Sequence, residues 1–219
     1  MGNLFPIYRI EKRVPGPIPG TKLPGAMHAI KDGEEVILID PFLVSKSETE
    51  FLEKEIGKPT LILITVETHV RDTEAYRKRY GARILANREA VSVLDIAVDD
   101  VFDDGDKLPG GLTAIGMPGM LLGETIFLRE GEKPALIVGD ALFNFQASDL
   151  GLFPGILMIP LGWPIGLGIM PRLFMKNQKL ADESYRKLLN QDFDQILVSH
   201  GRPILKGAKE KLQAVLEKL

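Results

Sequence analysis

The chain has 219 residues, of which 45% are hydrophobic and 26% charged, a composition typical of a globular protein with a sizeable core. Its formal net charge of -3 gives no broad attraction to phosphate groups, so no nucleic-acid partner is expected. The absence of cysteine excludes disulfides, thiolate metal sites and a cysteine nucleophile. We expect one domain over residues 1–219. A cytoplasmic location is expected, because the first residues show no basic stretch followed by an apolar core.

Strand-like and helix-like patterns alternate from the start of the chain. Residues 26–30 and 35–39 flank an Asp-Gly pair, which predicts an antiparallel hairpin. Residues 47–56 carry acidic residues early and apolar residues four apart, which predicts a short amphipathic helix with a Ser or Thr cap. Residues 61–65 form a compact apolar run after a proline, which predicts a buried strand.

A further helix and strand are expected after that run. Residues 72–80 favour a helix that ends at Gly81, and residues 83–86 favour the next strand. The acidic residues within 99–106 approach the spacing of an EF-hand calcium loop but lack the glutamate at its twelfth position. We therefore expect a solvated loop there.

The second half of the chain repeats the pattern in looser form. Strands are expected at residues 112–116, 125–129, 135–138 and 195–199, with helices at 179–190 and from 206 to the end. Two β-rich halves with outer helices predict an α/β (α+β) fold arranged as a four-layer αββα sandwich.

One apolar segment, residues 150–170, has no charged residue, and its three prolines forbid a continuous helix. No transmembrane span is expected there despite its length. We expect an insertion at about residues 150–175 and leave four interpretations open: a lid over a site, a homodimer interface, peripheral contact with a membrane surface, or buried irregular core. The apolar side chains available to a lid or interface are Phe153, Leu157, Trp163 and Leu167.

Three regions of the chain carry linked motifs. Residues 64–72 read Ile-Thr-Val-Glu-Thr-His-Val-Arg-Asp, residues 116–120 read Gly-Met-Pro-Gly-Met and precede Gly-Asp-Ala-Leu-Phe at 139–143, and residues 198–203 read Val-Ser-His-Gly-Arg-Pro. In their order and spacing they resemble the metallo-β-lactamase-fold superfamily over about residues 20–205. The resemblance implies a hydrolase fold whose metal ligands stand in these three regions.

The chain departs from that family at its metal ligands. The family's first loop reads Thr-His-x-His-x-Asp-His, because two divalent ions need imidazole and carboxylate ligands from one turn. Aligned on Thr65, this chain has at the ligand positions Val66, Thr68, Val70 and Arg71. Aligned instead on the distance to Gly81, His69 takes the place of the last histidine. In the second region Met120 stands where the family has a histidine, and its thioether suits such a site poorly.

Asp140 and His200 match the family ligands directly, and with His69 they make two imidazoles and one carboxylate. This set suits one divalent Zn, Fe or Mn ion with open positions, whereas a two-metal site is not expected. Accessory roles are open for four further residues: Glu67 and Asp72 as a ligand or base, Met120, and Arg71. In the alternative without metal, the Arg71 guanidinium pairs with Asp140 and fills the place of a cation.

Two functions therefore remain open. The first is a divergent member of the superfamily that lacks standard two-metal hydrolase activity and binds a small ligand or a partner. The alternative is a mononuclear metal-dependent hydrolase of a small ester, lactone, amide or thioester. Two nearby polar residues are expected to be structural, His28 within a strand and Asp40 at a strand end, although Asp40 could also lie near a pocket floor.

Overall fold

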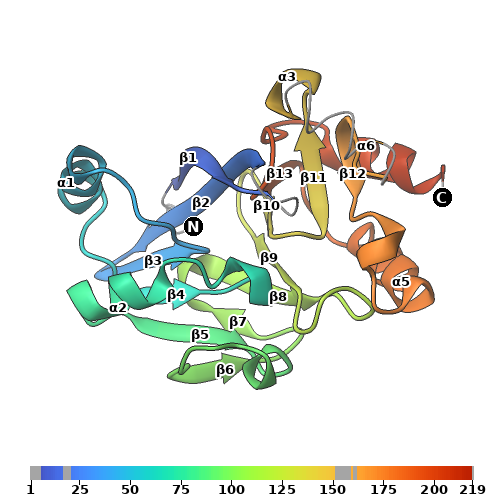
Figure 1. Ribbon diagram of the computed structural model, residues 1–219. Coiled ribbons are helices and arrows are strands. Elements are labelled where there is room, and N and C mark those ends of the chain that lie inside the picture. The colour runs from blue at the N-terminus through green and yellow to red at the C-terminus, as the bar shows by residue number, and fades with distance from the viewer. Residues whose placement is uncertain (1–5, 17–20, 151–158, 160–161, 219) are drawn as a thin grey trace.

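The computed structural model describes residues 6–16, 21–150, 159 and 162–218 and is built on two β-sheets (Figure 1). The first sheet has six strands in the order β1-β2-β3-β4-β5-β6. Their bounds are β1 (Ile7–Pro15), β2 (Lys22–Asp32), β3 (Glu35–Ile39), β4 (Leu61–Leu63), β5 (Arg83–Asn87) and β6 (Asp100–Phe102).

The second sheet has five strands in the order β13-β10-β9-β8-β7, and a separate two-stranded ribbon pairs β11 with β12. Their bounds are β7 (Lys107–Leu108), β8 (Leu112–Gly116), β9 (Thr125–Arg129), β10 (Ala135–Val138), β11 (Leu142–Phe145), β12 (Gly166–Ile169) and β13 (Gln195–Val198). The described α-helices are α1 (Lys46–Glu55), α2 (Thr73–Tyr80), α3 (Ala147–Leu150), α5 (Gln178–Leu188) and α6 (Ala208–Leu216). Short 3-10 turns are η1 (Glu67–His69), η2 (Ala90–Ser92), η3 (Pro109–Gly111) and η5 (Arg172–Phe174).

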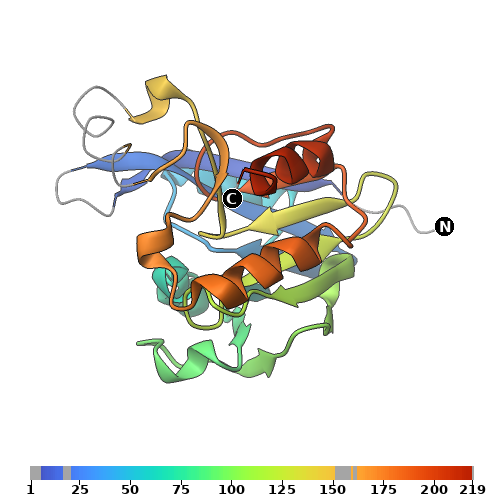
Figure 2. The same cartoon turned by 90° about the vertical axis from the view of Figure 1, so that its right-hand side faces the viewer.

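The sheets and helices form four layers, because each sheet buries both faces. Side chains of α1 and α2, such as Leu52 and Tyr76, belong to the core on the outer face of the first sheet. Side chains of α5 and α6, such as Tyr185 and Leu212, belong to the core on the outer face of the second sheet, which Figure 2 shows behind these two helices. A third core lies between the sheets, so the expected αββα sandwich is confirmed.

Strand periodicity explains how each sheet serves two cores. Successive side chains of a strand point to opposite faces of the sheet. In β3, Ile37 packs between the sheets while Leu38 packs under the outer helices. In β10, Ile137 faces the inter-sheet core and Leu136 faces the outer core. Continuous apolar runs are therefore required in these central strands.

Local signals in the sequence account for several element boundaries. Gly33 has a φ of 59° in the turn between β2 and β3, and Gly81 has a φ of 71° at the end of α2. Ser45 caps α1 with a capping box completed by Glu48. The expected hairpin, the helix after it and the helix ending at Gly81 are confirmed.

Five of the described strands, β1, β6, β7, β11 and β12, were not expected from the sequence. Asp100–Phe102 forms β6 rather than a solvated loop, because it pairs with β5 and buries Phe102 in the inter-sheet core. The strand β1, which was not predicted, pairs antiparallel with β2 from Ile7 opposite Ile30 to Pro15 opposite Lys22. Charged residues interrupt the edge strand β1 at Arg9 and from Glu11 to Arg13, which hides this strand from a search for apolar runs.

The apolar segment at 150–170 contributes both to the ribbon and to the core. Phe153 and Leu157 lie outside the described residues. Trp163 is buried, and Leu167 lies on β12 and packs against the outer core of the second sheet. Across the ranges that the structure describes, we find no helix with both the length and the apolar character needed to traverse a bilayer.

Candidate metal centre

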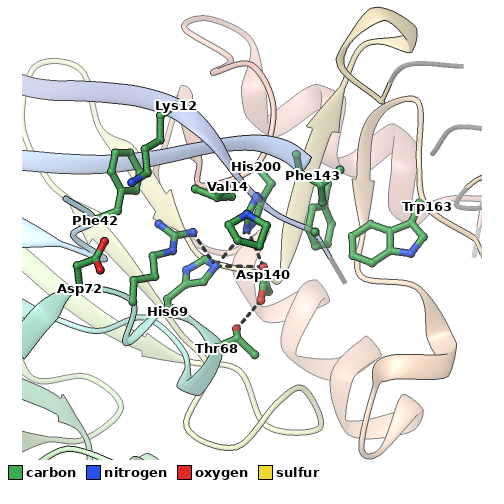
Figure 3. A pocket seen from close by; sticks show the side chains of 14 residues that line it. Lys12, Val14, Phe42, Thr68, His69, Asp72, Asp140, Phe143, Trp163 and His200 are labelled. Atoms are coloured by element: carbon green, nitrogen blue, oxygen red, sulfur yellow. Dashed lines mark hydrogen bonds and ion pairs between the residues drawn. The ribbon is translucent and has the colours of Figure 1, made fainter. Parts of the chain in front are cut away.

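Three loops, each at the end of a strand, bring His69, Asp140 and His200 together. His69 ends the turn η1 after β4, Asp140 follows β10, and His200 follows β13. Strands β10 and β13 are parallel neighbours, so their carboxyl ends meet at one edge of the second sheet. One ligand-type atom from each residue lies within 4.8 Å of the others. Figure 3 shows the three side chains converging, as expected from the sequence.

The two imidazoles face each other through the same type of nitrogen. The distance from His69 Nε2 to His200 Nε2 is 3.1 Å. The Asp140 Oδ1 atom lies 3.4 Å from the first nitrogen and 3.3 Å from the second. These three atoms therefore surround one small space.

Hydrogen bonds on the far side of each ring fix the tautomers. The His69 Nδ1 atom lies 2.8 Å from Asp40 Oδ2, and the His200 Nδ1 atom lies 2.9 Å from the carbonyl oxygen of Pro24. A carboxylate and a carbonyl can only accept, so both Nδ1 atoms must donate. In the neutral rings both Nε2 atoms then present lone pairs to each other and to Asp140, an arrangement that suits a bound cation.

Asp40 and Thr68 support the group from outside it. Asp40 is fully buried, and its carboxylate also accepts from the backbone N–H of Thr65 at 2.9 Å and from the Thr65 hydroxyl at 2.6 Å. The Thr68 hydroxyl donates to Asp140 Oδ2 at 2.7 Å, which leaves Oδ1 directed at the two histidines. Asp40 thus lies behind His69 in a supporting position.

Glu124 orients the Asp140 loop, a role that no motif around this residue indicates. Its Oε1 atom accepts from the backbone N–H groups of Asp140 and Ala141, each at 3.0 Å. Burial, together with the negative charge of Asp140, raises the pKa of Glu124 well above its usual range. Through these two backbone hydrogen bonds Glu124 holds the loop in place.

The charges of the group depend on each other. Burial opposes ionisation of Asp140, but the neighbouring rings of His69 and His200 hold its pKa well below the usual range. Burial and Arg71 both oppose protonation of His69, yet Asp140 and Asp40 together raise the pKa of that ring. Burial lowers the pKa of His200. Asp140 is thus an ionised carboxylate beside the two rings.

Arg71 brings a fixed positive charge to the same place. Its Nη1 atom donates to the carbonyl oxygens of Ala26 and Asp40, both at 3.1 Å, and its Nη2 atom lies 3.0 Å from His69 Nε2. From the sequence we considered an ion pair between Arg71 and Asp140. Among the described residues, Arg71 instead donates its hydrogen bonds to the groups just named, and its charge attracts Asp140 only at longer range. Arg71 has a φ of 44°, a left-handed conformation uncommon for arginine.

A cavity of about 530 Å³ opens over the group. Beside the three ligand-type residues it is lined by Lys12, Val14, Pro15, Gly16, Leu23, Phe42, Thr68, Arg71, Asp72, Phe143 and Trp163. The Trp163 ring stands edge-on to Phe143 with 4.7 Å between ring centroids. Trp163 therefore forms part of the pocket wall, although it comes from the apolar segment.

The remaining candidate residues lie in different surroundings. Asp72 lines the cavity, and its Oδ2 atom accepts from the backbone N–H of Leu43 at 2.7 Å. Glu67 begins η1 and is half-buried but is not among the lining residues. Met120 is buried in the outer core of the second sheet. Lys12 and Phe42, which line the cavity, were missed because single residues in unremarkable surroundings carry no motif.

The donor set fits one divalent ion. Two imidazole nitrogens and one ionised carboxylate are the ligands that Zn(II) and Fe(II) accept in single-metal centres. The hydrogen bonds that His69 donates to Asp40 and His200 donates to the Pro24 carbonyl are the outer hydrogen bonds that ligating histidines usually make. At the positions where the resemblance places two further histidines, the chain has Val66, which is fully buried, and Thr68, which is bonded to Asp140.

Comparison of the chain with known proteins finds a matching family model. A family model described as the metallo-beta-lactamase superfamily matches residues 26–159, which is more than half of the chain. No curated protein matches the chain.

Solved structures with the same fold are distant in sequence. A metallo-beta-lactamase from Pontibacter korlensis is 14% identical, with a TM-score of 0.68, and the match covers 97% of this chain and 95% of that one. The native FEZ-1 metallo-beta-lactamase from Legionella gormanii is 20% identical, with a TM-score of 0.58 and coverage of 100% and 95%. A protein crystallised in a di-iron-bound form is 16% identical, with a TM-score of 0.62 and coverage of 92% and 96%.

Proposed function

Since the chain belongs to the metallo-beta-lactamase superfamily, we propose that it is a divergent member that holds a single divalent metal ion and hydrolyses a small ester, lactone, amide or thioester. The observation that carries this proposal is the geometry of three atoms: the Nε2 atoms of His69 and His200 lie 3.1 Å apart, and Asp140 Oδ1 lies within 3.4 Å of both. When both rings are neutral, their Nε2 lone pairs repel at that separation, and an ion bound to all three atoms would remove this repulsion. A standard two-metal mechanism is not part of the proposal.

In this proposal His69, Asp140 and His200 are the metal ligands. A bound divalent ion supplies Lewis acidity, which polarises a carbonyl oxygen and makes water more acidic. Asp40 and the Pro24 carbonyl keep both rings in the ligating tautomer, and Thr68 and Glu124 orient the carboxylate. The cavity of about 530 Å³ is large enough for a small substrate above this group.

The first test is metal analysis by mass spectrometry on protein purified without chelator or nickel. We expect about one Zn, Fe or Mn ion per chain, lost in Asp140→Ala and in His200→Ala, because three ligands are the least that such a centre needs. Asp72→Asn, which alters the same cavity outside the ligand group, is the control and should retain the ion. Two ions per chain would contradict the single-metal proposal.

A second candidate function is binding of a small ligand without catalysis. It is favoured by Arg71, whose Nη2 atom donates to the same His69 nitrogen that an ion would need. Absence of bound metal after incubation with each ion, in wild type and in Arg71→Met, would support this candidate. Metal bound without turnover of ester, lactone, amide and thioester substrates would leave the ion with a structural role and remove the hydrolase proposal.

A further inference from the structure

We propose that Lys12 and Arg71 form an anion-binding pair that selects ligands with a carboxylate at one end and an apolar body at the other. The inference rests on the proposed function, because it names the class of substrate for the same cavity. It is carried by three observations: the charge of this pair, the order of residues along the cavity, and the hydrogen bonds that the nearby carboxylates already make.

The two cations come from distant parts of the chain and meet at one aromatic ring. Lys12 lies on β1, and Arg71 follows η1. The Lys12 Nζ atom lies 4.5 Å from the centroid of the Phe42 ring, and the Arg71 guanidinium carbon lies 5.7 Å from the same centroid. All three residues line the cavity. Two positive charges therefore lie next to the Phe42 ring at one end of the cavity.

Neither cation forms a salt bridge among the described residues. The Lys12 Nζ atom donates to the carbonyl oxygen of Leu43 at 2.7 Å, which occupies one of its three donors. The Arg71 donors reach two carbonyl oxygens and one imidazole nitrogen, all of them uncharged partners when His69 is neutral. Donors remain on both side chains for an incoming anion.

The carboxylates near this pair have other partners. Asp40 accepts from Thr65 and bonds to His69, and Asp72 accepts from the Leu43 backbone through Oδ2. Among the residues that line the cavity, Lys12 and Arg71 together with a bound divalent ion would carry four positive charges, against two negative charges on Asp72 and Asp140. The loaded cavity has an excess of positive charge that an anionic ligand would balance.

The cavity is polar at one end and apolar at the other. Figure 3 shows Lys12 and Phe42 on one side, His69, Asp140 and His200 in the middle, and Phe143 and Trp163 on the far side. A ligand with its carboxylate on the cations and its apolar body against Phe143 and Trp163 would span the three ligand-type residues. A bond between those two ends would lie over the metal centre.

Isothermal titration with phenylacetate and with the uncharged phenylacetamide tests the proposal. We expect zinc-loaded wild type to bind phenylacetate at least about tenfold more tightly than phenylacetamide, which corresponds to one charge-assisted hydrogen bond. Lys12→Met should remove most of this preference, and Arg71→Lys should reduce it, because a lysine cannot reproduce the planar array of donors. Lys31→Met, an exposed lysine at the far end of β2, is the control and should bind as wild type does.

The possible outcomes distinguish failure of the anion-binding pair from failure of the metal proposal. Equal binding of both probes, or a preference that Lys12→Met leaves unchanged, would overturn the anion-binding pair. A preference that disappears on zinc removal but survives both substitutions would place the carboxylate on the ion and would also overturn it. Because zinc content is measured on the same samples, loss of the metal proposal is seen separately, and the effect of Lys12→Met is then read on zinc-free protein.

Discussion

Asp40 determines which nitrogen of His69 faces the cavity. Its carboxylate lies 2.8 Å from His69 Nδ1 and is fully buried, and the backbone of this residue has a φ of 52°. Although burial favours the neutral acid, His69, Arg71 and Thr65 hold the pKa of Asp40 below its usual range. The carboxylate is therefore ionised, and the proton of the His69 ring stays on Nδ1.

Asp40→Asn should weaken metal binding without unfolding the protein. Asparagine tolerates a positive φ, so the backbone at this position is preserved. Loss of an outer carboxylate on a ligating histidine typically costs 10- to 100-fold in metal affinity, and we expect a dissociation constant for zinc raised by about that factor. Competition with a chromophoric chelator measures it. An affinity equal to that of Asp72→Asn would show that Asp40 does not act on the metal.

His28 makes a second prediction, which concerns stability and pH. This residue is fully buried on β2, and its Nε2 atom lies 3.2 Å from Arg9 Nη1. Burial and the positive charges of Arg9 and Arg71 lower its pKa from 6.5 to about 3, and Asp40 opposes this only in part. Between these two values the unfolded chain binds a proton that the folded chain does not.

The stability from neutral His28 is therefore complete above pH 6.5 and is lost as the pH falls from 6.5 towards 3. We expect the free energy of unfolding of metal-free wild type to decrease by roughly 1 kcal/mol per pH unit more than that of His28→Gln across this range. Glutamine can still accept from Arg9 and does not ionise. Urea titrations at several pH values measure the difference, and parallel curves for the two proteins would contradict the role of His28.

At the level of elements, close backbone contacts position the metal loops. The loop after β13 returns against β11, where the backbone N–H of Asn144 donates to the His200 carbonyl oxygen at 3.1 Å. Gly201 has a φ of 103°, and a Cβ atom added there would lie 2.2 Å from the Asn144 carbonyl oxygen. Only glycine fits between these two segments.

Gly201→Ala should consequently displace His200 and reduce zinc binding. Gly105→Ala is the matched control, because Gly105 also has a positive φ, 91°, but a Cβ atom there would meet nothing within 4 Å. A positive φ strains alanine in both variants, whereas the clash is confined to Gly201. Urea unfolding and zinc content together separate the effects. Equal losses in both variants would mean that the contact with Asn144 is unimportant.

At the level of the whole molecule, the candidate centre joins the two halves of the sandwich. His69 comes from the half built on the first sheet, and Asp140 and His200 come from the half built on the second. An ion bound to all three would link strands whose side chains otherwise meet in the inter-sheet core. Binding that requires both halves in place stabilises the folded state alone.

Zinc should therefore raise the stability of the whole protein. At a free zinc concentration 100 times the dissociation constant, we expect about 2.7 kcal/mol of added unfolding free energy, as for any ligand that binds only the folded chain. The shift of the urea midpoint with and without zinc measures it. Asp140→Ala should show no such shift. A shift of equal size in that variant would indicate zinc binding elsewhere on the protein.

Much of this protein could be predicted from the sequence. Apolar runs and turn residues marked the central strands and the helices α1, α2, α5 and α6, because period and glycine conformation are local properties. The linked motifs indicated the family and singled out His69, Asp140 and His200, which the fold brings together. The edge strands β1, β6 and β7 were not predicted, since their pairing depends on a neighbouring strand and leaves little apolar pattern.

Tertiary structure alone decided how the candidate ligands are supported. The partners of His69 and His200 are Asp40 and the Pro24 carbonyl, which stand 29 and 176 positions away in the chain. Lys12 and Arg71 meet at Phe42 only after β1 pairs with β2. Hydrogen bonds and charges act over a few ångströms of space, and the chain sets those distances only by folding. Sequence therefore determined the residue types and the layers, and folding determined which nitrogen, oxygen or charge faces the cavity.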